Sequence, residues 1–151
     1  MNVKSKSILE GVCGLLKENW AGKHSARVSV ADNPGHAINL LTQGLGGVSA
    51  VVFYMSDTPT VSSFPGNTML DATVRIGVVQ KTSLEVRDGS GASPILDVVD
   101  DLRKYMAGVA SKVEGLADPL EYKGMTPIQM ADGRALDGYA LSYLARYAFD
   151  V

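Results

Sequence analysis

The sequence predicts an α+β fold in one domain, residues 1–151, with a mostly antiparallel sheet covered by helices on one face as a two-layer sandwich. Residues 70–78 and 135–149 alternate apolar and polar side chains, as half-buried strands do. Apolar residues follow the helical period at 8–20 and 94–113. Short connections between neighbouring strands favour antiparallel pairing, and helices gathered on one face give two layers.

The composition is that of a folded domain without a nucleic-acid surface. Hydrophobic residues make up 46% of the chain and charged residues 20%, which suits a chain with its own core. The net charge is −2, and the 14 Lys and Arg residues are spread without a basic run, so we expect no direct nucleic-acid recognition. Glu10 and Gly11 interrupt the apolar start of the chain. We therefore expect neither a signal peptide nor a membrane span, and a soluble protein that is cytoplasmic where it is made.

The first elements are a helix at 8–20 and a short strand at 28–30. Ser7 and Glu10 have the spacing of a capping box at the start of the helix. The only cysteine, Cys13, lies within the apolar helical pattern and has no basic neighbour, so we expect a buried structural thiol and not a reactive one. The strand at 28–30 is indicated by valines that alternate with polar residues.

A shorter helix precedes the strand that we expect in the middle of the sheet. Asn33 is a typical N-cap, Pro34 is a typical first residue, and the glycines from Gly44 onward end the helix. Residues 48–54 are almost all apolar, which predicts a strand covered on both faces. The alternating run at 70–78 follows as the second clear strand.

The rest of the chain adds the longest helix and a closing pair of strands. The helix begins at Pro94, and its apolar stripe continues to Val113. Strands at 120–130 and 135–149 are joined through an Asp-Gly turn dipeptide. Alternate residues of the last strand share the face that we expect to be buried: Tyr139, Leu141, Tyr143, Tyr147 and Phe149.

No grouping of residues points to catalysis, a metal or a cofactor. The glycine-rich run at 44–47 precedes a strand and lacks the lysine of a phosphate-binding loop, so we interpret it as a helix stop and turn. His24 and His36 have no carboxylate or second histidine at ligand spacing, and we expect them to be solvated or capping residues. The chain is predicted not to be an enzyme, with no catalytic residues, no cofactor and no metal.

Three aspartates share one face of the long helix: Asp97, Asp100 and Asp101. Carboxylates in this arrangement could hold a divalent cation. They also lie in the first two turns of the helix, where the helix dipole favours negative charge, and Asp100 has the spacing to pair with Lys104. We interpret them as a solvated helix face.

Two connections are candidates for contacts with other proteins. The stretch 56–68 is longer than a usual hairpin turn and carries apolar side chains among polar ones, as docking loops do. It would equally suit a loop folded back over the chain's own core. The connection 81–91 is charged and contains glycines, so we expect it to be solvated until a partner binds. The predicted interface residues are Val61, Phe64, Arg87 and Asp88.

The order of these elements resembles the tail-terminator and tail-completion (minor tail) proteins of long-tailed bacteriophages. The resemblance lies in the opening helix at 8–20, the two central strands, the helix at 94–113, and the strand with Tyr122-Lys123-Gly124 that leads into the closing aromatic strand. It covers nearly the whole chain as a pattern of elements.

This resemblance implies a virion structural protein that acts in virion assembly without turnover. Such a protein forms a homo-oligomeric ring, commonly a hexamer, that caps the tail tube and offers a docking surface to the head connector or stopper protein. Its partners would be further copies of itself, the tail tube protein and the connector, and its place would be the head-proximal end of the tail. Two alternatives stay open: another head–tail joining or minor tail protein, or a small cytoplasmic ligand-binding α+β domain.

Overall fold

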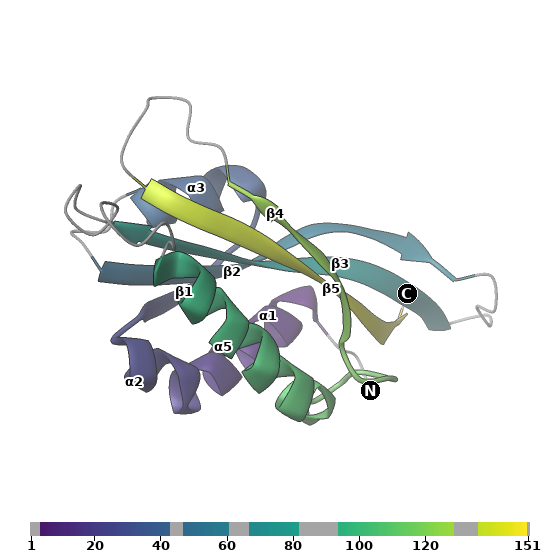
Figure 1. Ribbon diagram of the computed structural model, residues 1–151. Helices are drawn as coiled ribbons and strands as arrows, with labels where there is room; N and C mark the ends of the chain where they lie inside the picture. Colours follow the sequence, from purple (N-terminus) through teal and green to yellow (C-terminus); the bar gives the residue numbers. More distant parts are fainter. Residues whose placement is uncertain (1–3, 43–46, 61–66, 82–93, 129–135, 151) are drawn as a thin grey trace.

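Five strands form one mixed sheet that organises the chain (Figure 1). The computed structural model describes residues 4–42, 47–60, 67–81, 94–128 and 136–150. The elements in chain order are α1 (Ser5–Glu18), α2 (Trp20–His24), β1 (Arg27–Ala31), α3 (Pro34–Thr42), β2 (Gly47–Pro59), β3 (Asn67–Lys81), α5 (Pro94–Val109), the 3₁₀ helix η1 (Ala110–Lys112), β4 (Glu121–Pro127) and β5 (Leu136–Asp150). The predicted α+β class is confirmed.

The strands lie in the order β1-β2-β3-β5-β4. β1 and β2 are parallel, and every other pair is antiparallel. The prediction that the apolar strand at 48–54 forms the middle of the sheet is wrong, because β3 occupies that place. The chain returns after α5 to add β5 and β4 on the far side of β3, which moves the centre of the sheet by one strand.

Helices cover both faces of the sheet. α1, α2 and α5 lie together on one face over the main core, to which β3 and β5 contribute every second residue (Figure 1). α3 packs on the opposite face, where Ala37 and Leu41 meet Val51, Phe53 and Val79. The prediction that all helices share one face is therefore wrong for α3. Its physical reason lies in β2, which is apolar on both sides and needs cover on both.

The helix boundaries differ from the predicted ones mainly in α1. This helix begins at Ser5, two residues before Ser7, so the predicted capping box is not formed and the N-cap makes no side-chain hydrogen bond. The helix breaks at Asn19, and α2 follows directly. The predicted cap of α3 is confirmed, since Asn33 Oδ1 accepts the backbone N–H of His36 at 2.9 Å.

β2 and β3 are longer than predicted and form an extended hairpin. β2 continues to Pro59 and β3 begins at Asn67, so both ends of the predicted loop 56–68 are strand. The polar end of β2 still pairs with β3, because β3 is held on its other side by β5 along its whole length. β1 is too short to reach this part of β2. The exposed β2 residues 56–59, together with their β3 partners 70–73, are called the arm below.

A chain of hydroxyl groups fastens the base of the arm to the main core. Tyr147 in β5 is fully buried, and its hydroxyl lies 2.7 Å from Ser5 Oγ and 2.9 Å from Tyr54 Oη. Tyr54 donates to Asp57 Oδ2 at 2.5 Å. Because this bond uses the only hydroxyl hydrogen of Tyr54, Tyr147 must donate to Tyr54, and Ser5 in turn donates to Tyr147. Burial, followed by the hydrogen bond to Asp57, raises the pKa of Tyr54 well above its usual value.

We expect Tyr147→Phe to lower the free energy of unfolding by about 1–2 kcal/mol, because the buried hydroxyl of Tyr147 links two partners that would each lose a hydrogen bond. Urea unfolding followed by circular dichroism measures this loss. Tyr139→Phe is the matched control, because Tyr139 lies on the same strand and its hydroxyl makes no hydrogen bond within the described chain. Equal stability of the two variants would contradict a role for the hydroxyl chain.

Candidate functional site

The interface residues predicted from the sequence lie outside the described residues. Val61 and Phe64 follow the arm in the sequence, and Arg87 and Asp88 belong to the segment between β3 and α5. The candidate site is therefore built from the elements that border these segments. Its parts are the arm, the edge of the sheet at β4 and the edge at β1.

The histidine expected to be solvated instead joins two helices. His24 in α2 is 15% exposed, and its Nε2 lies 3.0 Å from Asp101 Oδ2 in α5. The same oxygen accepts from Lys23 Nζ at 2.9 Å, and both contacts lower the pKa of Asp101, the Lys23 hydrogen bond most strongly. Trp20 packs beside His24 and donates to the carbonyl of Val98 at 3.3 Å. This cluster is a joint between α2 and α5, which sequence spacing could not predict because 77 residues separate His24 from Asp101.

The aspartates of α5 do not form a cation site in the described structure. Asp101 is held by α2, and Asp100 pairs with Arg103 and not with the predicted Lys104. Across the described ranges, no group of three His, Cys, Asp or Glu side chains is placed to hold a metal ion. Cys13 is buried as predicted, and burial raises the pKa of its thiol.

The sheet ends in two strands that have a neighbour on one side only. β1 forms one edge and β4 the other, and no other described strand pairs with either outer side. The β2 residues of the arm pair with β3 on one side only, so their other side is a third exposed strand edge within the described residues. Unpaired strand edges carry free backbone donors and acceptors, and they are common places for contact with another chain.

The β4 edge borders an apolar hollow between β4 and α5. This β4 hollow measures about 570 Å³, and its lining includes Met106, Ala107, Leu120, Tyr122 and Tyr143, with Arg103 at its side. Tyr122 is 41% exposed and packs on Tyr143 with ring centroids 5.5 Å apart. An exposed aromatic side chain beside an apolar hollow is typical of a protein contact.

The backbone of β4 is itself poorly suited to pairing with a further strand. The N–H of Ile128 donates to the carbonyl of Gly138 at 2.9 Å, so the backbone of Pro127, one residue earlier, points away from β5. Proline has no N–H to offer on that outer side. A register shift lies between Tyr122 and Gly124, and Gly124 has a φ of 124°, which other residues rarely adopt. Contacts at this edge therefore depend on side chains and the hollow.

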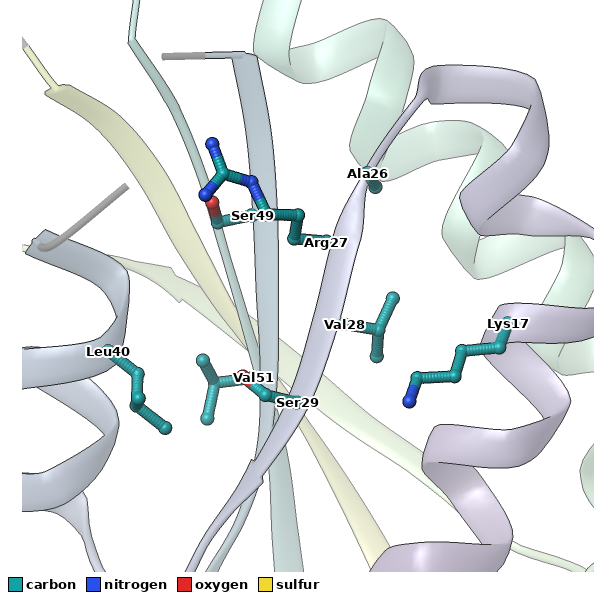
Figure 2. A pocket seen from close by; sticks show the side chains of 8 residues that line it. All are labelled: Lys17, Ala26, Arg27, Val28, Ser29, Leu40, Ser49 and Val51. Atoms are coloured by element: carbon teal, nitrogen blue, oxygen red, sulfur yellow. The ribbon is translucent and has the colours of Figure 1, made fainter. Parts of the chain in front are cut away.

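The β1 edge lies in a groove between α1 and α3 (Figure 2). Lys17 reaches toward the strand from α1, and Leu40 faces it from α3. Arg27 begins the strand and is exposed. The groove has a hollow of about 610 Å³ toward α3 and another of about 430 Å³ toward α1. It is named the β1 groove below.

A cluster of charges on the helix-free part of the sheet joins the arm to the start of β4. Arg146 in β5 donates to Asp71 in β3 through Nε at 2.6 Å and Nη2 at 3.2 Å. Its Nη1 donates to Asp118, in the segment before β4, at 3.1 Å. The paired bonds to Asp71 hold the two central strands in register at the base of the arm. The Arg146 hydrogen bond also lowers the pKa of Asp71.

The chain matches no protein-family model and no curated protein. Among the described residues, no helix is long and apolar enough to cross a membrane.

We expect Asp71→Asn to reduce the free energy of unfolding at pH 7 by at most about 1 kcal/mol, as for other partly exposed ion pairs. The pKa of Asp71 is lower in the folded protein, so its contribution is present above the unfolded value and is lost as the pH falls through the folded value. The difference from the wild type should therefore vanish in strong acid. Urea unfolding at several pH values measures it, with Glu114→Gln, an exposed carboxyl without an ion pair in the described chain, as the control. A difference that stays constant down to strong acid would contradict this role of the Asp71 carboxylate.

Proposed function

We propose that the chain is a tail terminator of a long-tailed bacteriophage, a virion structural protein that forms a ring on the end of the tail tube. The observation that carries the proposal is the pair of dissimilar surfaces that the sheet exposes at separate places, the arm and the β4 hollow. The order of elements on which the resemblance rests supports the same reading. The described part of the chain also offers no grouping of side chains for metal chemistry.

Two dissimilar surfaces on one chain suit a ring. When one surface of a subunit binds a different surface of the next, the contact is head-to-tail, and it closes into a ring if the rotation between subunits divides a full turn. In the proposed ring, the arm side of one copy meets the β4 hollow of its neighbour. Val61 and Phe64 follow the arm in the sequence and supply apolar side chains for an apolar hollow. Six copies are what the resemblance implies.

The proposed ring works by binding and transforms no substrate. One of its faces binds the last ring of the tail tube protein, and the other binds the head connector or stopper protein. A cap must copy the docking surface of the tube on one face and reject a further tube subunit on the other, which is a requirement on specificity and not only on affinity. The protein would then reside at the head-proximal end of the tail, after synthesis in the host cytoplasm.

Electron microscopy of the purified protein mixed with tubes of its cognate tail tube protein tests this function. We expect closed rings on tube ends and tubes that no longer elongate. Rings at another position in the virion would support a different head–tail joining or minor tail protein. A protein that stays monomeric at saturating tube concentrations and leaves tube length unchanged would overturn the proposal.

A single substitution in the β4 hollow tests the contact between subunits. Ala107 is exposed on α5 and lines the hollow, so Ala107→Trp should fill it without disturbing the core. We expect a folded protein that forms at least about tenfold fewer rings, which corresponds to a loss of about 1.4 kcal/mol per contact or more. Ser7→Trp, an exposed position on α1, is the control and should leave ring formation intact. Normal rings with Ala107→Trp would exclude the hollow as the contact.

A further inference from the structure

The β1 groove has the form of a vacant strand position. β1 pairs with β2 through residues 27–31, and no described strand lies on its other side. The space beside it is open on both faces of the sheet, with one hollow toward α3 and another toward α1. A strand added to a sheet edge needs this arrangement, because its successive side chains point to opposite faces.

The hollow toward α3 combines a polar strip with an apolar wall. Ser29 and the buried Ser49 supply hydroxyl groups, and Leu40 and Val51 supply apolar surface (Figure 2). Arg27 lies at one end of the same hollow. A side chain that points from an added strand to this face would meet a guanidinium group and hydroxyl donors.

The hollow toward α1 is shaped by a glycine. Cys13 and Gly14 of α1 face Val28 and Val30 across it, and a Cβ built on Gly14 would meet nothing within 4 Å. A larger residue at position 14 would reach into the space, so its absence leaves room for a small apolar side chain from outside.

The charged residues that line the hollow toward α3 are both positive. Lys17 lines both hollows and points from α1 toward β1, and Arg27 lines the hollow toward α3. Neither makes an ion pair with another residue of the described chain. Glu10 lines only the hollow toward α1. A strand with acidic side chains toward α3 would complement this pattern.

We propose that the β1 groove binds an extended segment of another protein as a sixth strand, with acidic side chains toward α3 alternating with small apolar side chains toward α1. Backbone hydrogen bonds to β1 supply affinity, and Lys17 and Arg27 select the acidic sequence. The inference goes beyond the proposed ring, because the groove is separate from both the arm and the β4 hollow.

A second copy of this chain is a poorer occupant than another protein. The edge strand β4 has one acidic residue, Glu121, which is already paired with Lys123 at 3.2 Å, and its Pro127 lacks an outward N–H. The acidic residues of the arm, Asp57 and Asp71, are already engaged by Tyr54 and Arg146. The described strand edges of this chain therefore lack the acidic, unbroken character that the groove requires.

A capped peptide in which glutamate alternates with valine is the direct probe, used with the whole chain 1–151 and no tail tubes. Hydrogen exchange followed by NMR is expected to show amides of β1 protected about tenfold when the peptide concentration is ten times its Kd. The peptide with glutamine in place of glutamate should bind at least about fivefold more weakly, as expected for the loss of charge pairs worth about 1 kcal/mol. Equal binding of the two peptides, or binding without protection of β1, would overturn the proposal.

Substitutions at two positions of the groove distinguish peptide binding in the groove from general electrostatic attraction to the protein. Lys17→Gln should weaken binding about fivefold, whereas Lys104→Gln, the same change at an exposed position on α5, should have no effect. Gly14→Ala should raise the melting temperature and keep peptide binding, and Gly14→Leu should keep the fold and abolish binding by filling the hollow.

The remaining outcomes each exclude the inference in a different way. If the peptide does not bind but Gly14→Leu changes the oligomeric state, a second copy occupies the groove. If Lys17→Gln only promotes aggregation, the lysine protects an edge strand and selects no partner. Neither result bears on the ring, because ring formation is measured on tubes and depends on the β4 hollow. Failure of the two proposals is therefore distinguishable.

Discussion

The pairing of β3 along its whole length is the constraint on which the rest of this structure depends. β3 pairs with β5 from Asn67 to Lys81, and on its other side with β2 over nearly the same range. This double pairing sets the register of both neighbours, and a shift by one residue would turn every side chain to the wrong face. The fixed register therefore directs Ala72, Val74 and the other alternate residues of β3 into the main core under the helices.

The exposed edges follow from the unequal lengths of the strands. β2, β3 and β5 have 13 to 15 residues, whereas β1 has 5 and β4 has 7. Because β1 is short, part of β2 has a strand partner on one side only. Both edges of the sheet lie at the surface. The arm exists because β5 supports β3 there, and the hydroxyl chain from Tyr147 to Asp57 ties its base to the core. The exposed strand edges of this protein are thus products of strand length.

The fold class and most elements could be predicted because they depend on local periodicity. Alternation in the last strand placed Tyr143 and Tyr147 correctly in the core. Features that depend on distant contacts could not be predicted. The polar residues 56–59 show no alternation and are strand only because β3 is held by β5, and α3 lies on the second face because Val51 and Phe53 need cover there. The β1 groove had no sequence signal, since Gly14 and Lys17 look like ordinary surface residues of an amphipathic helix.

The two edges of the sheet are protected in chemically different ways, and the difference bears on function. β4 carries Pro127 and an irregular register at Gly124, which permanently reduce its capacity to accept a strand. β1 has neither feature, and its open side is faced by Lys17. A lysine discourages neutral or basic strands by the cost of burying its charge, but an acidic strand removes that cost by pairing with it. A proline weakens pairing with any added strand, whereas a lysine weakens pairing with all but an acidic strand. A strand edge that is protected only by a lysine can therefore remain unpaired in the free protein and still be able to bind an acidic strand.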